Sequence, residues 1–411
     1  MKAQDIKLED LYRLELKTWW TYFKGESFAF KMICLYLFTE YVRPQSIWPW
    51  LDILPWAQLF VIGALFGLLA DPKKKWVKSP INKWMILFFL SILWSTHHAH
   101  YPDWSYRHLA NFYTWFVIYF LIINIVTTPQ RFLCFLAIFC IASFKLSFSL
   151  ALTWAMRGFA FTGWGLSGPP GFFQNSGELA IQMAVFWPIG LAVALSLRPY
   201  LPKWKRYVLI LMPITAGMVI LGASSRGGQL AGLVQFSLRF AKQVFKFKVL
   251  VSVVFVGLLA WSFLPTEQKQ RFSEAGSDRT SQQRFLYWEN GYEMMMEHPW
   301  TGVGYFNFIP YYETYYTSDM LYEHAELAHN IMVQVGADLG YPGLVIYCCL
   351  IFCLLRRRVK KEPNFPVTYS ALRLSLIGFL IAGQFVSVVY YPFMWVAASF
   401  IAIHNALYND Y

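Results

Sequence analysis

The stretch HNIMVQVGADLGYPGLVIYCCLIFCLLRRR, residues 329–358, decides the fold class because it joins a long apolar run to a block of arginines. The apolar part predicts a helix over about 328–354, which is long enough to cross the hydrocarbon core of a bilayer. Three consecutive arginines follow at 356–358, and basic residues are typical of the cytoplasmic end of a span. His329 and Asn330 stand at the opposite end of the run.

The composition extends this membrane assignment to the whole chain. Of 411 residues, 57% are hydrophobic, 19% are aromatic and only 14% are charged, and the mean hydropathy is +0.39. A soluble domain of this size could not stay in solution with that balance. The sequence therefore predicts an all-α, polytopic integral membrane protein with about twelve transmembrane helices. They are expected at about 28–42, 54–70, 82–96, 109–126, 132–154, 177–197, 207–223, 228–240, 248–264, 328–354, 370–389 and 392–408.

The basic residues predict how the spans are oriented. If the N-terminus is cytoplasmic, the even-numbered connections hold most of the lysines and arginines, in clusters at 73–83, 198–206, 239–248 and 356–361. Cytoplasmic loops are enriched in these residues, so both termini are predicted to be cytoplasmic. The net charge of +12 is then a topological signal, and no nucleic-acid partner is predicted.

This topology divides the chain into four parts. Residues 1–27 are predicted to lie along the cytoplasmic interface, without a cleavable signal peptide. Residues 28–264 hold spans one to nine, 265–327 form a cap on the periplasmic face, and 328–411 hold spans ten to twelve. All six cysteines fall inside predicted spans, so neither a disulfide framework nor a cysteine metal site is indicated.

Two outer loops are predicted to have structure of their own. The cap segment SDRTSQQRFLYWENGYEMMMEHPWTGVGYFNF predicts an amphipathic helix on the bilayer that ends at PWTGVG. Its apolar residues recur at helical spacing, at Phe285, Trp288, Tyr292 and Met296. The loop GFAFTGWGLSGPPGFFQNSGE, residues 158–178, is rich in glycine and proline and predicts a re-entrant lip.

Two outer-face arginines are candidates for binding an anion. Arg226 lies in GASSRGGQ, next to the N–H groups of a starting helix, where glycines would let the backbone approach a ligand. A contact with lipid headgroups is the plainer alternative for Arg226, and no nucleotide P-loop accompanies it. Arg284 opens the cap helix in SQQRFLYW, where a solvated or headgroup contact is the ordinary role.

His329 is a candidate general base. It lies at the predicted start of the tenth span, where the helix dipole opposes an added positive charge, so the imidazole should tend to stay neutral and accept a proton. Glu326 or Asn330 could orient the ring. A purely structural role for His329 remains an alternative. So does a metal site with Glu323 and His324, although His324 and His329 are five residues apart, which separates them by roughly 140° around a helix.

Two further basic residues could support an anionic ligand. Lys145 lies near the middle of a predicted span in FCIASFKLSFSLAL, where a charge is costly and usually faces a cavity or a partner. It could attract an anion, or pair with an acid such as Glu178 or Glu40. Arg43 lies in EYVRPQSIWPW, after the first span. No metal and no other cofactor is predicted.

These residues predict an outward-facing pocket that suits a lipid-linked phosphate or pyrophosphate. Arginines would neutralise the leaving group, and the histidine would deprotonate an acceptor hydroxyl. A transporter for lipid-linked glycans is the alternative from another class. It is less favoured, because no internal repeat joins the two halves and the candidate residues lie on one face.

Three segments resemble the successive signatures of the bacterial O-antigen ligase and polymerase superfamily: SSRGG, QQRFLYWENGYEMMMEHPWTGVGYFNF and HNIMVQVGADLGYPG. In that family a small-residue-flanked Arg precedes a span, Arg-x-x-x-Trp and Pro-x-x-Gly-x-Gly lie in the large periplasmic loop, and His-Asn opens the next span. The resemblance covers about 160–350. The N-terminal half, with EYVRPQSIWPW and FKLSF, is similar to the ligase-like branch, including O-glycosylation ligases associated with exosortase systems.

The resemblance implies a glycosyltransferase of the GT-C type in the bacterial inner membrane, with its active site facing the periplasm. The donor would be an undecaprenyl-pyrophosphate-linked glycan, transferred with inversion and without metal. The lipid A core is the acceptor expected first, as in an O-antigen ligase; a polymerase or a protein O-oligosaccharyltransferase is the alternative. Arg226 and Arg284 would hold the pyrophosphate, and His329 would activate the acceptor. The family often has Glu where this chain has Asp338, which leaves the role of that carboxylate open.

Overall fold

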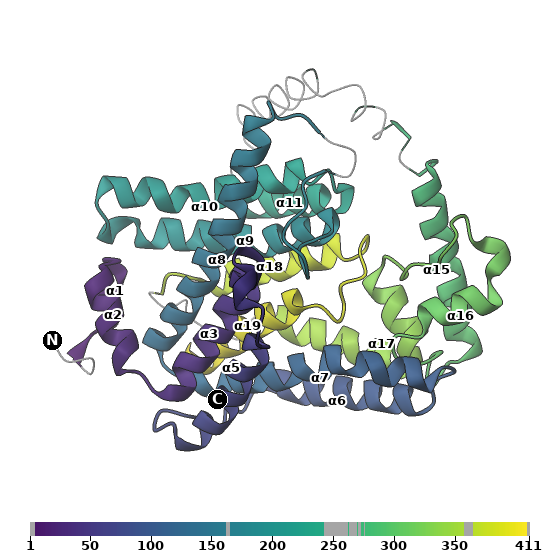
Figure 1. The fold of residues 1–411 in the computed structure, drawn as a ribbon, viewed down its shortest axis with the longest axis horizontal. Coiled ribbons are helices and arrows are strands. Elements are labelled where there is room, and N and C mark those ends of the chain that lie inside the picture. The colour runs from purple at the N-terminus through teal and green to yellow at the C-terminus, as the bar shows by residue number, and fades with distance from the viewer. Residues whose placement is uncertain are drawn as a thin grey trace.

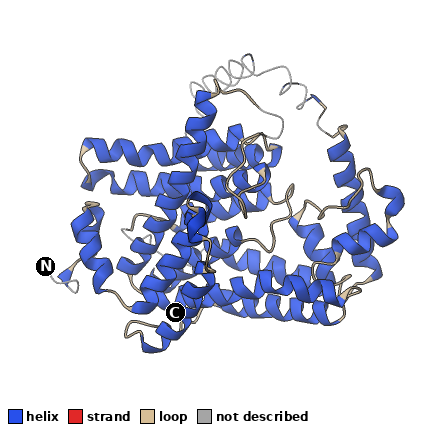
Figure 2. Cartoon of the chain, in the orientation of Figure 1, coloured by secondary structure: helices blue, strands red, loops and turns tan. Residues whose placement is uncertain are grey.

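The part of the chain that is described consists of helices and loops. The computed structural model describes residues 5–161, 165–241, 276–356 and 365–408, with residues 262, 269, 273 and 274. Every regular element in those ranges is a helix (Figure 2), so the all-α prediction is confirmed. Five helices are long and apolar enough to cross a membrane: α7 (Pro102–Ile125), α8 (Pro129–Met156), α9 (Ser176–Leu197, continued to Tyr200 by η3, Arg198–Tyr200), α10 (Lys203–Gly222) and α17 (Ile331–Leu355).

Shorter helices occupy the other predicted spans. They are α3 (Phe28–Val42), α5 (Trp56–Ala70), α6 (Pro80–His97), α11 (Arg226–Arg239), α18 (Tyr369–Ala382) and α19 (Pro392–Tyr408). The predicted span 248–264 lies outside the described residues, so the count of twelve stays a prediction. α18 ends at Ala382, earlier than predicted, and an irregular segment, 383–391, leads to α19.

The remaining elements are short. The N-terminal segment forms α1 (Leu8–Tyr12) and α2 (Leu16–Gly25), with Leu16 and Trp20 exposed. Two small turns, α4 (Pro44–Ile47) and η2 (Pro49–Leu51), follow α3. The cap contains α15 (Arg279–Glu297), α16 (Phe308–Tyr315) and η4 (Thr317–Asp319). In Figure 1 the N-terminus lies at the left, α15 and α16 lie at the right, and α6 and α7 run side by side along the lower edge.

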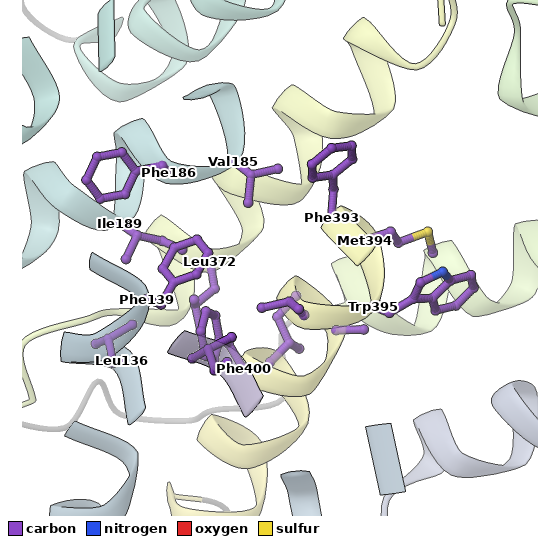
Figure 3. Packing of buried hydrophobic residues seen from close by; sticks show 14 of the residues in the cluster. Leu136, Phe139, Val185, Phe186, Ile189, Leu372, Phe393, Met394, Trp395 and Phe400 are labelled. Carbon is purple, nitrogen blue, oxygen red and sulfur yellow. The ribbon is translucent and has the colours of Figure 1, made fainter. Parts of the chain in front are cut away.

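The core forms around α9 and α19, whose side chains are apolar on nearly all sides, as expected for interior helices. Figure 3 shows side chains from four helices meeting there. Phe139 of α8 lies between Phe186 of α9 and Phe400 of α19, with ring centroids 6.2 and 5.2 Å away. This core holds the outer ends of α9, α11 and α18 close together.

A buried ion cluster joins the opposite ends of three helices. Arg131 opens α8 with its side chain fully buried and donates to Glu26, which precedes α3, at 2.8 Å. It also donates to both carboxylate oxygens of Asp71, the residue after α5, at 2.8 and 3.0 Å. A buried charge is stable only when it is paired, so this cluster fixes the packing of α3, α5 and α8.

The cap has its own small hydrophobic core and a distinct outer face. Tyr287 and Met294 of α15 are buried in that core. On the other face of α15, Phe285, Tyr292 and Met296 have exposed fractions of 47%, 56% and 52%. The predicted helix is therefore present, and most of its apolar stripe is exposed, as contact with a bilayer would require.

The PWTGVG segment inserts into a break in α17. Gly340 has φ 67° and ψ −170°, which interrupts the helix. Its neighbours bond to the segment: the Tyr341 N–H donates to the Pro299 carbonyl at 2.8 Å, and the Val303 N–H donates to the Ala337 carbonyl at 2.8 Å. These bonds attach the cap directly to the membrane bundle.

Asp338 belongs to this junction. Its side chain is fully buried and accepts a hydrogen bond from the Tyr390 hydroxyl at 3.1 Å, while its backbone carbonyl accepts one from Ser95 at 2.6 Å. Asp338 also lies about nine residues, or roughly 13 Å of helix, beyond His329. The structure therefore gives this carboxylate a role in joining the helices.

Candidate functional site

One cavity of about 950 Å³ contains the three residues that the sequence singled out. Arg226, Arg284 and His329 all line it, and they come from α11, α15 and the segment before α17. The predicted lip contributes a wall through residues 165–178, and residues 385–391 contribute another part of the lining. Segments far apart in the sequence thus meet at one end of the helices.

Four helices begin at this cavity. α9, α11 and α15 start behind the side-chain caps Asn175, Ser225 and Asp278, which all line the cavity. His329 lies just ahead of α17, whose cap is Asn330. Helix N-termini carry a partial positive charge and free N–H groups. Their convergence makes the cavity suited to an anion of more than one charge.

Arg226 is held by an acid that the sequence reasoning did not identify. Its guanidinium donates to Asp278 at 3.1 and 3.2 Å and to the Ser281 hydroxyl at 3.3 Å. Burial alone would raise the pKa of the Asp278 carboxyl group, but hydrogen bonds from Ser281 and Arg226 lower this pKa to about 2. Asp278 is 52 residues from Arg226, so no local pattern could have paired them. An anion that binds at Arg226 would compete with this carboxylate.

The glycines after Arg226 serve packing, and Gly227 also lines the cavity. Gly227 and Gly228 are buried. A Cβ on Gly227 would lie 2.8 Å from Phe385, and one on Gly228 would lie 2.5 Å from the Ala180 side chain. They let α11 pack closely against α9 and the segment after α18.

Arg284 lines the cavity, and in the described part of the chain it forms no ion pair, although the charges of Glu326 and Asp278 lie nearby. Its Nε is buried and has no hydrogen-bond partner within the described ranges. Burial and the nearby charge of Arg226 lower the pKa of Arg284. A guanidinium that is partly desolvated and lies close to a second one is stabilised when an anion binds between or beside them.

His329 forms a close pair with Glu326. The His329 Nε2 lies 2.7 Å from a Glu326 carboxylate oxygen. This hydrogen bond lowers the pKa of Glu326, so the carboxylate is ionised and can only accept. In the neutral tautomer that donates from Nε2 to this carboxylate, the lone pair lies on Nδ1. Nδ1 is buried and has no hydrogen-bond partner in the described part of the chain.

The backbone around His329 is fixed by three contacts. The His329 N–H donates to Ser387 at 2.8 Å, the Trp288 indole donates to the Ala328 carbonyl at 2.9 Å, and the Glu326 N–H donates to the Tyr287 hydroxyl at 2.8 Å. His329 itself has φ 51°, a left-handed conformation that a non-glycine residue adopts only when its surroundings hold it there. α15 thus supplies Arg284 and also holds the segment that carries the histidine.

Two other candidate residues, Asn330 and Lys145, have different positions from those expected. Asn330 does not orient the ring, because its side-chain oxygen caps α17 by accepting from the Met332 and Val333 N–H groups at 2.9 and 3.2 Å. Lys145 is exposed on α8 and does not line the cavity, so it neither faces this ligand site nor pairs with Glu178 or Glu40.

Arg43 supports the site from outside. It lies at the end of α3 with φ 51° and donates to the Pro170 carbonyl in the lip, but it does not line the cavity. The grouping of Glu323 and His324 with His329 is also absent. His324 is 82% exposed and lies 3.8 Å from Glu313, and the described residues contain no cluster of three or more metal-ligating side chains.

The arrangement combines three chemical capacities in one space. Arg226, Arg284 and the helix N-termini can hold an anion and stabilise negative charge that develops on a leaving group. His329, oriented by Glu326, can accept a proton when its imidazole is neutral. Such a cavity suits transfer of a group from a phosphate-containing donor to a hydroxyl.

Comparison with known proteins agrees with the sequence resemblance. Residues 209–348 match the family described as O-Antigen ligase. No curated protein matches this chain. The matched range includes Arg226, Arg284 and His329 and ends within α17, so it covers the wall of the cavity that holds both arginines, the cap and the candidate base.

Proposed function

We propose that this chain, a member of the O-antigen ligase and polymerase superfamily, is an O-antigen ligase of the GT-C glycosyltransferase type. It transfers polysaccharide from undecaprenyl pyrophosphate to the lipid A core. The reaction takes place at the periplasmic face of the bacterial inner membrane. Membrane lipids surround the bundle and contact the exposed stripe of α15.

The observation that carries this proposal is the position of the His329–Glu326 pair in a cavity that also holds Arg284, which forms no ion pair in the described part of the chain. The pyrophosphate binds at Arg226 and Arg284. The acceptor hydroxyl hydrogen-bonds to the imidazole of His329. Both substrates then lie in one enclosed space, which is the arrangement that direct transfer requires.

The proposed reaction is a single displacement. The imidazole of His329 takes the proton from the acceptor hydroxyl as its oxygen attacks the anomeric carbon of the donor sugar. The bond from that carbon to the pyrophosphate oxygen breaks, and undecaprenyl pyrophosphate leaves. Attack from the side opposite the leaving group inverts the anomeric configuration. Glu326 stabilises the imidazolium, and the two guanidiniums stabilise the charge on the pyrophosphate.

The mechanism assigns no step to a metal ion, because the arginines neutralise the leaving group. Transfer by the purified protein should therefore persist in excess chelator. Loss of activity that one particular divalent ion restores would contradict this part of the proposal.

The function is tested by the lipopolysaccharide banding pattern and the undecaprenyl-linked glycan pool in the native host, with and without this gene. A ligase predicts that the ladder disappears from lipid A while polymerised glycan accumulates on undecaprenyl. Lipid A that carries a single repeat would mean a polymerase, and an unchanged pattern would direct attention to glycoproteins. Movement of the lipid-linked glycan without a new glycosidic bond would mean transport.

A further inference from the structure

The cavity contains a carboxyl group that the proposed mechanism does not use. Glu178 lies in the first turn of α9 and lines the cavity with the two arginines. Within the described ranges, no ion pair involves Glu178, and the Tyr391 side chain lies beside its carboxyl group. The cavity thus presents a guanidinium, Arg284, and a carboxyl group, Glu178, that form no ion pair with each other.

The two groups stand on chemically different walls. Arg226 and Arg284 belong to α11 and α15, and they bring two guanidiniums to one wall, beside the carboxylates of Glu274 and Asp278. The wall around Glu178 comes from the lip and the start of α9, and its other polar members are neutral. They are Ser167, Gln174, Asn175 and Ser176, and Tyr391 lines the cavity from the segment before α19.

Residues 385–387 connect both walls to the candidate base. A Cβ on Gly227 of α11 would meet Phe385 at 2.8 Å, and one on Gly177 of α9 would meet Val386 at 2.9 Å. The next residue, Ser387, accepts the hydrogen bond from the His329 N–H at 2.8 Å. His329 is therefore fixed to the same short segment that contacts both the wall of the two arginines and the wall of Glu178.

The Glu178 wall is a poor place for a pyrophosphate. An ionised carboxylate repels it, and a protonated carboxyl group offers it only one donor. The same group suits a sugar, because carboxyl oxygens accept hydrogen bonds from hydroxyls in either protonation state, and the neighbouring amide and phenol groups can both donate and accept.

We infer that Glu178, with Tyr391, forms a subsite for the acceptor sugar, where the hydroxyl groups beside the attacking one are bound. The inference rests on the proposed function and adds the position of the second substrate. The donor pyrophosphate then occupies the wall of the two arginines, the acceptor sugar occupies the Glu178 wall, and His329 lies on the segment that joins them.

The test compares Glu178→Gln and Tyr391→Phe with the unaltered, full-length protein in detergent or nanodiscs. Two quantities are measured: the KM for the acceptor glycolipid during transfer, and the Kd for farnesyl pyrophosphate, a soluble probe of the pyrophosphate site. Glu323→Gln is the matched control, because Glu323 is an exposed acid close in sequence to Glu326 that does not line the cavity.

We expect Glu178→Gln to raise the acceptor KM at least tenfold and Tyr391→Phe to raise it several-fold, with the farnesyl pyrophosphate Kd unchanged within twofold. Glu323→Gln should change neither quantity. An unchanged acceptor KM in both cavity variants would overturn the subsite, as would weaker farnesyl pyrophosphate binding without any change in that KM. Failure of the proposed function is distinguishable, because the unaltered protein would then form no glycosidic bond.

Discussion

Replacing Asp278 by asparagine should tighten the binding of pyrophosphate to this cavity. The carboxylate of Asp278 lies 3.1 and 3.2 Å from the Arg226 guanidinium. It therefore neutralises positive charge that would otherwise bind the donor pyrophosphate, and it repels the incoming anion. At a separation of about 6 Å and an effective dielectric constant of about 40, Coulomb's law gives about 1.4 kcal/mol for each unit of ligand charge. Removing the charge should therefore lower the Kd about tenfold for each unit of negative charge that the ligand carries.

The substitution is mild in other respects. Asparagine caps helices as well as aspartate does, so α15 should still begin at Arg279. The side chains of Arg226 and Asp278 are 36% and 25% exposed, and an ion pair this accessible contributes only about 0 to 1 kcal/mol to stability. The melting temperature should consequently change little.

The assay is calorimetric titration of the detergent-solubilised protein with inorganic pyrophosphate and with farnesyl pyrophosphate. Asp103→Asn is the control, because Asp103 is an exposed acid at the start of α7 outside the cavity. It removes the same charge from the molecule and should leave the Kd unchanged. Equal or weaker binding by a folded Asp278→Asn protein would refute the view that this carboxylate competes with the ligand.

Four further outcomes follow from the contacts described above. His329→Ala should reduce transfer by about 10² to 10⁴-fold while farnesyl pyrophosphate binding persists, whereas Arg226→Ala or Arg284→Ala should weaken that binding; full activity in His329→Ala would remove the histidine from the mechanism. Glu326→Gln should lower kcat about tenfold, because a charge-assisted hydrogen bond is replaced by a neutral one. Steady-state kinetics at saturating substrates measures this, and an unchanged kcat would contradict the role given to Glu326. Arg131→Met should destabilise the protein by about 3 to 5 kcal/mol, because Glu26 and Asp71 would remain buried without a cation; neutralising both acids as well should restore part of the loss in thermal unfolding. The pKa of Asp278, about 2, lies below its ordinary value. The small contribution of its ion pair to folding stability is therefore complete above about pH 4 and is lost as the pH falls towards 2, where any difference between the unfolding curves of the native protein and Asp278→Asn should vanish.

The sequence predicted the positions of the helices more completely than it predicted how the candidate residues group. Long apolar runs predict helices from local pattern alone, so each predicted span in the described ranges overlaps a helix, although α18 is shorter than predicted. Arg226, Arg284 and His329 could be assigned to one face because the basic residues orient the spans. The structure adds that these three residues line one cavity.

The partners of these residues were not predictable in the same way. Asp278 is 52 residues from Arg226, and Ser387 is 58 residues from His329, so each pairing depends on how the helices pack. Glycine also has several uses, and the sequence does not distinguish them. Gly227 and Gly228 pack helices together, although their position beside an arginine suggested a ligand. Asn330 likewise proved to be a helix cap.

The insertion of residues 299–304 into the break of α17 sets the boundary at which this protein could be recombined with a relative. A chimera that exchanged the cap alone would separate the Val303 and Tyr341 N–H groups from the Ala337 and Pro299 carbonyls that accept from them. The exchangeable module therefore extends through the first half of α17, past the kink at Gly340. It carries Arg284, Glu326 and His329 with it, and leaves Arg226 and Glu178 to the recipient.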